Sequence, residues 1–505
     1  MLDVHQLPDD INALKAMIVA REALIESRDA RIEALEAQLA LLKRRQFGQS
    51  SEKLERAIAQ LEFALEDLQE DGGLAAGRLG ALAGEAFSPE RRVPVRGLLP
   101  DHLPTEDIVH AAPDACPACG GELRRLGEDV REELEYVPGS FRRMRHVRPK
   151  LSCRSCETIV QAPPASMPIP KGKAGPGLIA HVLVSKYCDH LPLYRQSAIY
   201  AREGVGLERS TMADWVGRAS ALMEPLIAAL GRHVFAAGVI HGDDTPVPVL
   251  EPGAGKTKTG RLWVYVRDER SSGSKVPPAA FYRYSPDRKG EHCQGHLKSF
   301  KGVLQADGYA GFNELYRGDI TEAACWAHAR RKFFDVHAAS GSPIAEDALR
   351  RIGDLYRIEE RVRGKPPDER RAARLEQSRP ILDAMKPWLA ARRDELSRKS
   401  ELAKAIGYAL TRWTALSRFL DDGRVEIDNN AAERAIRGIA LGRKNYLFAG
   451  SDSGGTRAAA IYSLVETAKL NGLDPERYLR DVLARIADHP INKIEQILPW
   501  RIYAA

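Results

Sequence analysis

Three acidic residues, Asp243, Asp307 and Glu433, are the candidates for chemistry in this chain. Three carboxylates that meet at one point repel one another strongly unless cations lie between them. Mg²⁺ suits such a place because it binds a few carboxylates, keeps water ligands and accepts phosphate oxygens. Two such ions about 4 Å apart can activate the attacking oxygen and stabilise the leaving oxygen of an in-line displacement. The three acids therefore indicate metal-dependent chemistry on phosphodiesters, if the fold brings them together.

Each acid also has a purely structural interpretation. Asp243 precedes an Asp-Thr-Pro sequence and Asp307 precedes a glycine, so both can begin a turn. Glu433 can close a capping box with Asn430 or pair with Arg437 one turn further on. Taken singly, each acid is explained in this way, whereas the order of all three along the chain favours a metal site.

The elements around the acids are those of a mixed α/β domain. Strand-like runs at 238–250, 261–268 and 279–286 are joined by turns rich in Gly and Ser. Further strands at 302–309 and 320–328 are each preceded by a short helical piece, at 291–300 and 312–316. Three meandering strands followed by two helix-linked strands resemble the ribonuclease-H-like fold in order, and in that fold the first and fourth strands are neighbours. Asp243 lies in the first strand, Asp307 at the end of the fourth, and Glu433 on the first turn of a later helix.

Four cysteines form two CxxC pairs, Cys116 with Cys119 and Cys153 with Cys156. Four thiolates at two such turns can close a tetrahedral Zn²⁺ site without an open position, which indicates a structural metal. A redox pair is the alternative, but two CxxC elements, one of them followed by Gly-Gly, favour zinc. Metal binding is expected to be coupled to folding of so small a module. The basic run between the knuckles is expected to be a strand that pairs back and to contact DNA through Arg143 and Arg145.

The amino-terminal segment predicts a coiled coil. Ile11, Ile18, Ile25, Ile32 and Leu39 occupy the a positions of five heptads, and eight of the ten a and d positions are apolar. We interpret this segment as a self-association helix, with docking on the rest of the chain as the alternative. Residues 71–97 are rich in Gly and Ala and indicate a linker.

Residues 177–230 are expected to be helical. A Gly-containing turn at 204–206 separates two helices, and Ser210 is placed to cap the second. Helix, turn and helix is the arrangement that places a recognition helix in a major groove, although an ordinary helical hairpin has the same pattern.

The bulk composition is that of a globular protein. The 505 residues carry a formal net charge of +6, with 44% hydrophobic and 29% charged residues. No apolar stretch is long enough to span a membrane, and the first ten residues do not have the pattern of a secretion signal, so a cytoplasmic protein is expected. A mildly basic chain permits nucleic-acid binding without requiring it.

Long and specific strings make the sequence similar to a known family. They are RRQFGQSSEKL, the two CxxC pairs, HGDDTPVPVL, LQADGYAGFNELY, CWAHARRKFFD, EIDNNAAERAIRGIALGRKNYLFAGSDSGG and ETAKLNGLDPERYL. Over nearly its full length the chain resembles the large transposases of the insertion-sequence-66 family. Carried onto this chain, the acidic triad of that family falls on Asp243, Asp307 and Glu433. The family usually has Glu where this chain has Asp244, which leaves a choice between two adjacent acids on opposite faces of a strand.

The resemblance implies a multidomain α/β protein with a ribonuclease-H-like catalytic core and a helical insertion between Asp307 and Glu433. The expected order is a coiled-coil helix (1–70), a flexible linker (71–110), a zinc-binding module (111–165), a helical, helix-turn-helix-like region (166–230), the first part of the core (231–335), the helical insertion (336–421), the second part of the core with Glu433 (422–460) and a helical tail (461–505).

The function expected from this resemblance is cleavage of the ends of a mobile element and joining of the 3′-hydroxyls to target DNA, with two Mg²⁺ or Mn²⁺ ions in each active site. Further basic residues are expected to contact DNA phosphates: Arg330, Arg331, Lys332, Arg434, Arg443 and Lys444. His328 could join them, though a histidine with only a structural role is the commoner case. Expected partners are double-stranded DNA, a second copy of the chain and accessory proteins of the same element.

Two other functions fit parts of the pattern. A ribonuclease-H-like nuclease would cut DNA without joining it. A repressor or an inactive relic would bind the element's ends without chemistry, although an intact acidic trio favours an active enzyme.

Overall fold

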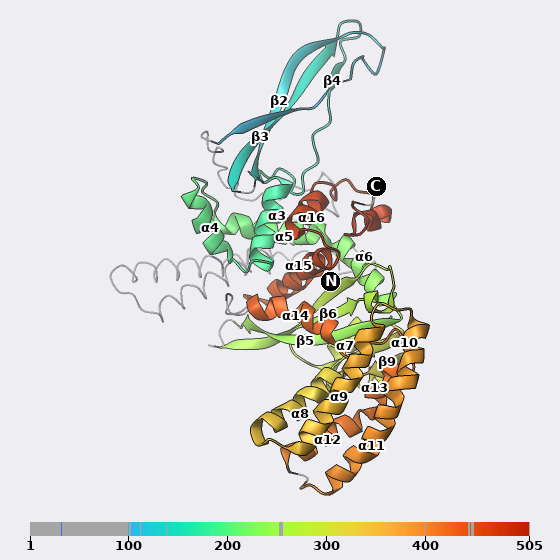
Figure 1. Cartoon of the computed structure of the whole chain (residues 1–505). Helices are drawn as coiled ribbons and strands as arrows, with labels where there is room; N and C mark the ends of the chain where they lie inside the picture. Colours follow the sequence, from blue (N-terminus) through green and yellow to red (C-terminus); the bar gives the residue numbers. More distant parts are fainter. Residues whose placement is uncertain are drawn as a thin grey trace, which may run out of the picture.

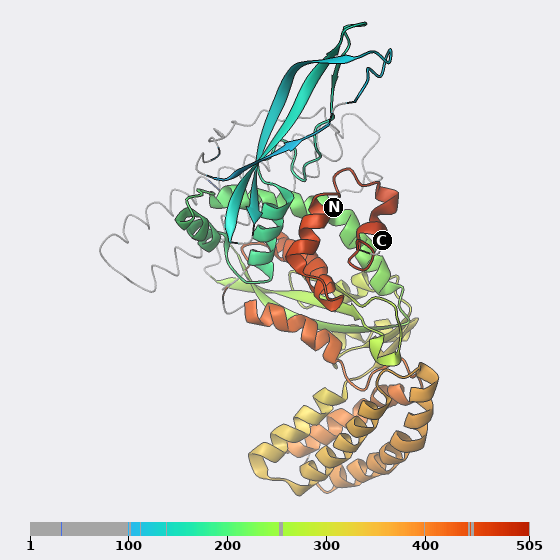
Figure 2. The same cartoon turned by 45° about the horizontal axis from the view of Figure 1, so that its top comes forward.

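The computed structural model describes residues 103–503, apart from 112, 138, 252–255, 398, 443–444 and 446–448, together with Ile32 and Leu99. The expected coiled coil, except for Ile32, and most of the expected linker lie outside the described residues, as do Arg443 and Lys444. The described part forms an elongated molecule with a β-hairpin arm at one end, a helical body at the other and a mixed sheet between them (Figures 1 and 2). No described helix is both long and apolar enough to cross a membrane.

The arm is a four-stranded sheet built on a long hairpin. Strands β2 (Leu123–Val137) and β3 (Ser140–Cys153) pair antiparallel, β1 (Thr105–Val109) adds parallel to β3, and β4 (Ile159–Gln161) pairs with the end of β3. The expected strand that pairs back between the cysteine knuckles is thus confirmed. The knuckles lie at the far end of the hairpin, while at its near end Leu134 donates to the carbonyl of Lys173 over 2.6 Å. Figure 1 shows the arm standing out from the body.

Four helices follow the arm: α3 (Pro176–Tyr187), α4 (Leu193–Arg202), α5 (Arg209–Leu222) and α6 (Glu224–Phe235). The expectation that Ser210 caps the second helix of the pair is wrong. Helix α5 begins at Arg209, so Ser210 is already helical, and the N-cap residue is Glu208, which has an extended backbone. Helices α4 and α5 contact each other and α3, an arrangement that suits both a helix-turn-helix and a plain hairpin.

The central sheet has the strand order β7-β6-β5-β8-β9. Its members are β5 (Val239–Leu250), β6 (Thr257–Arg267), β7 (Ala279–Ser285), β8 (Gly302–Gln305) and β9 (Ile320–Ala323). The first three pair antiparallel, whereas β5, β8 and β9 are parallel. The prediction that the first and fourth strands are neighbours is therefore confirmed.

The connections in the central sheet are short. A 3-10 turn, η3 (Arg270–Ser272), lies between β6 and β7, and α7 (Gly290–His296) leads to β8. The helix expected at 312–316 is wrong, because two 3-10 turns, η4 (Ala310–Phe312) and η5 (Leu315–Arg317), stand there instead. The stretch is bounded by Gly308 and Gly318, which leaves too few residues for a stable α-helix.

A separate helical body follows β9. It consists of α8 (Trp326–Ser340), α9 (Pro343–Val362), α10 (Pro367–Ala373), the π-helical η6 (Arg374–Ser378), α11 (Arg379–Asp394), α12 (Glu401–Thr411), α13 (Trp413–Ser417) and the 3-10 turn η7 (Arg418–Leu420). Its helices enclose a hydrophobic core of their own, around Phe333, Ile352 and Leu389. The helices begin at Trp326, before the boundary of 336 that the sequence indicates.

The chain then returns to the central sheet through α14 (Asn430–Gly442), α15 (Asp452–Leu470), α16 (Pro475–Leu483) and η8 (Ile491–Ile497). Helix α15 covers the edge strand β7: Ser463 accepts from the backbone N–H of Tyr282 over 2.9 Å, and Thr467 bonds both the N–H and the carbonyl of Ala280 over 3.1 Å. These hydroxyls occupy backbone groups that an edge strand otherwise leaves open to other chains. The last helices therefore belong to the main hydrophobic core rather than to a detached tail.

Candidate functional site

The two strand acids lie side by side because of the register of β5 and β8. His241 of β5 pairs with Gln305 of β8, and the same offset places Asp243 opposite Asp307, just beyond the end of β8. The parallel pairing ends at His241 and Gln305, and β5 continues beyond it, so Asp243 lies in the middle of β5 while Asp307 follows the carboxyl-terminal end of β8. Helix α14 begins beside this part of β5.

Asn429 holds α14 against this edge. Its fully buried side chain donates from Nδ2 to the carbonyl of Gly242 over 2.9 Å, and its Oδ1 lies 3.1 Å from His241 Nδ1. Its backbone N–H donates to Cys325 Sγ over 3.2 Å. Because Gly242 precedes Asp243 and Glu433 lies one turn into α14, these bonds fix the helix that carries Glu433 beside the strand that carries Asp243.

Gln305 supports the approach to α14 in the same way. It is fully buried at the end of β8, donates from Nε2 to the carbonyl of Glu426 over 2.6 Å and accepts from the N–H of Glu426 over 3.2 Å. The carboxylate of Glu426 in turn lies 2.6 Å from Arg370 of the helical body. Neither Asn429 nor Gln305 can be recognised from the sequence alone, because their partners are distant in the chain.

The carboxyl group of Asp243 has a strongly raised pKa. Burial raises its pKa to about 7, a hydrogen bond from the N–H of Asp244 lowers it, and the carboxylates of Asp307, Asp244 and Glu433 raise it further. That N–H, 2.8 Å from Oδ1, is its hydrogen-bond donor among the described residues. A buried carboxylate surrounded by others is stabilised by a bound cation, so the donor set suits Mg²⁺ or Mn²⁺.

Asp244 has a different environment. Its side chain is 1% exposed and lies between two arginines, with Arg261 Nη1 at 3.0 Å from Oδ2 and Arg288 Nη2 at 2.8 Å from Oδ1. Two guanidinium groups neutralise its charge without a metal. Of the two adjacent acids, Asp243 is therefore the one without a cationic partner among the described residues.

The purely structural interpretation holds for Asp307, which makes a turn hydrogen bond, but the capping box expected for Glu433 is not formed. Asn430 donates from Nδ2 to Asp428 over 2.7 Å and does not close a capping box with Glu433. Among the described residues, His328 lies beside Glu433, with Nδ1 at 3.6 Å from Oε1. Asp307 does shape its turn, since Oδ1 accepts from the N–H of Tyr309 over 3.2 Å. A turn role and a metal role are compatible for Asp307, because a carboxylate has a second oxygen to offer.

The described part of the chain contains two groups of potential metal ligands, and within each group the ligand atoms all lie within 4.8 Å of one another. One is the four cysteines of the arm, and the other is Cys325, His328 and Glu433. The acids Asp243, Asp307 and Glu433 do not form a third such group among the described residues.

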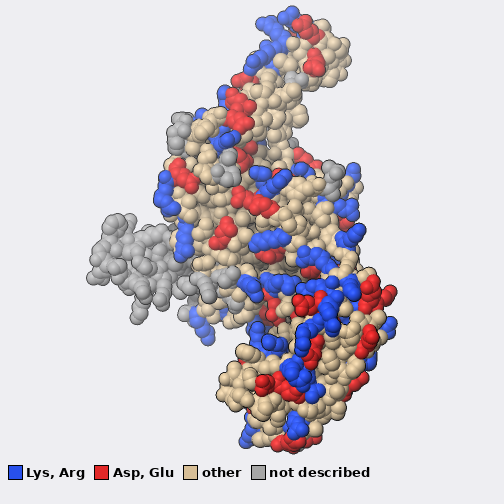
Figure 3. Space-filling model, in the orientation of Figure 1, with Lys and Arg blue, Asp and Glu red and all other residues tan. Residues whose placement is uncertain are grey.

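The expected phosphate-contacting residues of the helical body lie on α8. Arg330, Arg331 and Lys332 are exposed, and Lys332 Nζ lies 4.8 Å from the ring centre of Tyr408. Arg412 stacks on the same ring and donates from Nη2 to the carbonyl of Gly308 over 3.0 Å. On the face shown in Figure 3, Lys and Arg side chains gather where the helical body meets the central sheet. Arg434 on α14 is exposed as well.

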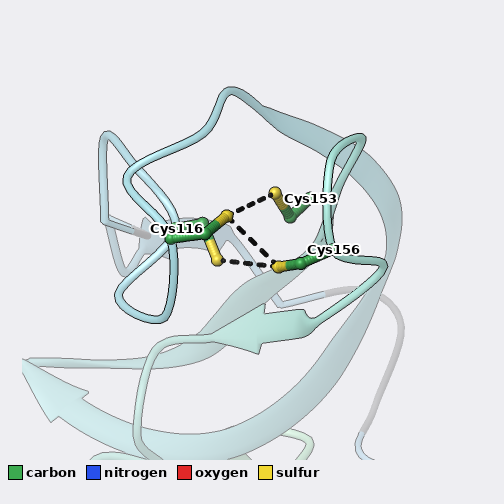
Figure 4. A group of neighbouring side chains, drawn as sticks. Cys116, Cys153 and Cys156 are labelled. Atoms are coloured by element: carbon green, nitrogen blue, oxygen red, sulfur yellow. Dashed lines mark hydrogen bonds between the residues drawn. The ribbon is translucent and has the colours of Figure 1, made fainter.

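The four cysteines of the arm come together at its far end. Cys116 Sγ lies 3.5 Å from Cys156 Sγ, and Cys119 Sγ lies 3.4 Å from Cys153 Sγ and 3.3 Å from Cys156 Sγ, as Figure 4 shows. The Thr158 hydroxyl, 3.1 Å from Cys156 Sγ, contributes to lowering the pKa of that thiol to about 6, which favours the thiolate that a metal binds. Four sulfurs in this arrangement fit a closed structural zinc site.

Glycine suits each of the two positions after the first knuckle for a different geometric reason. Gly120 has a left-handed φ of +71°, which favours glycine. A Cβ on Gly121 would lie 3.0 Å from Ser155 Oγ and 3.1 Å from Cys153 Sγ, so it would press the first knuckle against the second.

The basic strand β3 is largely neutralised by its neighbours. Arg143 lies 3.8 Å from Glu132 of β2 and Arg145 lies 3.6 Å from Asp107 of β1. Lys150 pairs with Asp129 over 2.6 Å. DNA phosphates would have to compete with these acids, so Arg143 and Arg145 offer less free positive charge than the sequence alone indicates.

Comparison with known proteins identifies the class of this chain as a transposase. The model of the "Transposase IS66 family" matches residues 171–457, more than half of the chain. Flanking matches are the "zinc-finger binding domain of transposase IS66" at 113–157, the "IS66 C-terminal element" at 463–500 and the "Transposase C of IS166 homeodomain" at 34–108. The chain belongs to the IS66 transposase family.

Full-length relatives of this chain occur in Sinorhizobium fredii. The uncharacterized protein y4hP is 44% identical over 91% of this chain and 87% of its own length. The uncharacterized protein y4qI is 38% identical over 99% of this chain and 98% of its own length.

The zinc-finger match and the cluster of four cysteines together support a structural zinc in the arm.

Proposed function

We propose that this chain is a DDE-type DNA transposase that cleaves the ends of an insertion sequence and joins the 3′-hydroxyls to target DNA. The proposal is supported by the register that sets Asp243 of β5 beside Asp307, and by the hydrogen bond from Asn429 that holds α14, the helix of Glu433, against β5. Asp244, by contrast, is neutralised by arginines. Membership of a transposase family supports DNA as the substrate.

The strand arrangement supports a ribonuclease-H-like core. Three antiparallel strands followed by two parallel strands, in the order β7-β6-β5-β8-β9, match that fold. The helical body then stands as an insertion between β9 and α14, and Gln305 and Asn429 return the chain to the site.

In the proposed mechanism Asp243, Asp307 and Glu433 would hold two Mg²⁺ or Mn²⁺ ions. Bound at this site, such ions would activate the attacking oxygen and stabilise the leaving one. Asn429 keeps α14 in place, so that Glu433 faces Asp243 without rearrangement. Basic side chains around the site bind DNA phosphates and hold the strand in line. They are Arg330, Arg331, Lys332 and Arg434, together with Arg443 and Lys444, which lie outside the described residues.

The zinc-bearing arm and the helices α3 to α5 are proposed to bind the element's ends, with Arg143 and Arg145 contributing where DNA displaces their acidic partners. Self-association through the amino-terminal heptads would let two active sites act on two ends. Accessory proteins of the same element are further partners, and the cytoplasm, at the nucleoid, is the proposed location.

The test is cleavage and strand transfer with the purified full-length chain, DNA that carries the element's ends, and Mg²⁺ or Mn²⁺. Asp243→Asn, Asp307→Asn and Glu433→Gln are each expected to abolish both reactions while DNA binding persists. Cutting without joining by the wild type would indicate a nuclease instead. Binding without either reaction would indicate a repressor or a relic, and cleavage by Asp307→Ala would refute the metal site.

A further inference from the structure

Asp244 lies beside the proposed catalytic acids and has no part in the chemistry above. Its almost fully buried carboxylate accepts from Arg288 twice, over 2.8 Å from Nη2 and 3.2 Å from Nε, both at Oδ1. Arg261 lies 3.0 Å from the other oxygen. The two hydrogen bonds fix the orientation of the Arg288 guanidinium, whereas Arg261 contributes a close positive charge.

The two arginines differ in what else they face. Arg261 lies within β6 and its side chain is 19% exposed, so it serves chiefly to neutralise Asp244. Arg288 follows β7, is 39% exposed, and places Nη2 at 4.0 Å from Asp307 Oδ2. Arg288 therefore stands at the open side of the acidic site, next to one of its proposed metal ligands.

The position of Arg288 is fixed from more than one side. Its guanidinium lies over the ring of Tyr309, 4.2 Å from the ring centre, and the Tyr309 hydroxyl donates to the carbonyl of Arg288. Asp244 occupies its Nε and Nη2, whereas Nη1 has no hydrogen-bond partner among the residues that the structure describes. A held guanidinium with an open edge beside the site is prepared to bind an anion.

We infer that Arg288 binds a backbone phosphate of the cleaved DNA strand, next to the bond that is broken, and that Asp244 is its positioning residue. This inference rests on the proposed function, since it takes the acids at Asp307 and Asp243 as the reacting centre. A phosphate is the expected ligand because its oxygens match the fork of donors on a guanidinium. The second acid of the Asp243-Asp244 pair then serves substrate binding rather than metal binding.

The alternative is that Arg288 only balances the charge of Asp244. Arg261 already contacts that carboxylate, so the two arginines would then be equivalent in any assay on DNA. The distinction calls for a measurement that reports contact with one phosphate.

The experiment is single-turnover cleavage by the full-length chain of DNA in which one phosphate at a time, on either side of the cleaved bond, is replaced by a neutral methylphosphonate. For the wild type, one position near the cleaved bond is expected to slow cleavage by roughly 10- to 100-fold, as loss of a hydrogen bond between charged groups does. Arg288→Gln is expected to cleave unmodified DNA more slowly by a similar factor and to show no further loss at that position. Asp244→Asn is expected to lose the same sensitivity, and Arg288→Lys to keep part of it.

Arg261→Lys is the matched control, because it alters the other partner of Asp244 and should keep the wild-type pattern of sensitive positions. Thermal unfolding and Mn²⁺ binding check that each variant retains its fold and metal site. The inference is overturned if Arg288→Gln cleaves as fast as the wild type or keeps the full sensitivity at every position. If the wild type cleaves no DNA at all, the proposed function fails instead.

Discussion

Replacement of Asn429 by alanine is the most informative perturbation of the candidate site. The side chain is fully buried and makes two hydrogen bonds to β5, one with the Gly242 carbonyl and one with His241 Nδ1. Alanine leaves both groups buried without this partner, at about 1–3 kcal/mol each. The destabilisation acts on the contact between β5 and α14, and so on the spacing of Asp243 and Glu433.

The expected result is a loss of cleavage rate of at least about 100-fold, since a shift of about 1 Å at a catalytic group has effects of that size. The assay is single-turnover cleavage of end DNA over a range of Mg²⁺ concentrations, because a displaced ligand also weakens metal binding. Asn430→Ala is the matched control, since among the described residues the Asn430 side chain bonds to Asp428 and not to β5, and this variant is expected to lose little activity. Full activity of Asn429→Ala at the wild-type Mg²⁺ requirement would refute the positioning role.

Three further predictions concern the arm, the acids and the sheet edge. Gly121→Ala is expected to weaken zinc binding, measured by competition with a chelator, because its Cβ would meet Ser155 and Cys153; Gly127→Ala, which meets nothing within 4 Å, should leave zinc binding unchanged. In buffer free of Mg²⁺ and Mn²⁺, Asp243 has a pKa of about 7 in the folded state, well above its ordinary value of 3.8, so the free energy of unfolding falls as the pH rises from about 4 towards 7. Asp243→Asn should therefore raise the free energy of unfolding at pH 8 by up to about 4 kcal/mol, with the gain vanishing near pH 4, whereas Asp244→Asn should lower it; equal effects of the two variants would contradict the assignment of the two acids. Thr467→Val removes the partner of two backbone groups of Ala280 and should cost about 2–5 kcal/mol in thermal unfolding, against little for the exposed Thr456→Val.

The sequence was informative where chemistry and local pattern coincide. Strands β5 to β7 follow from runs of β-branched and aromatic residues between glycine-rich turns, and the knuckles follow from cysteine spacing. The neighbourhood of β5 and β8 followed from the resemblance to a known strand order. The assignment of Asp243, Asp307 and Glu433 as metal ligands stays a prediction, although the structure brings β5, β8 and α14 together.

What the sequence did not show depends on contacts between distant segments. Asn429, Gln305 and Arg288 are ordinary polar residues until the fold places Gly242, Glu426 and Asp244 beside them. The hydroxyls of α15 acquire their role only against the edge of β7. The neutral character of β3 was open to prediction, because the acidic run before Gly139 faces the basic run after it in any hairpin with that turn.

A crystal structure of the full-length chain with Mn²⁺, located by its anomalous scattering, tests the central claim most directly. Mn²⁺ is expected within about 2.0–2.3 Å of carboxylate oxygens of Asp243, Asp307 and Glu433, while Asp244 keeps Arg261 and Arg288 as partners. Mn²⁺ bound by Asp244 in place of Asp243, or an acidic site that takes no Mn²⁺ at concentrations that support cleavage, would contradict it.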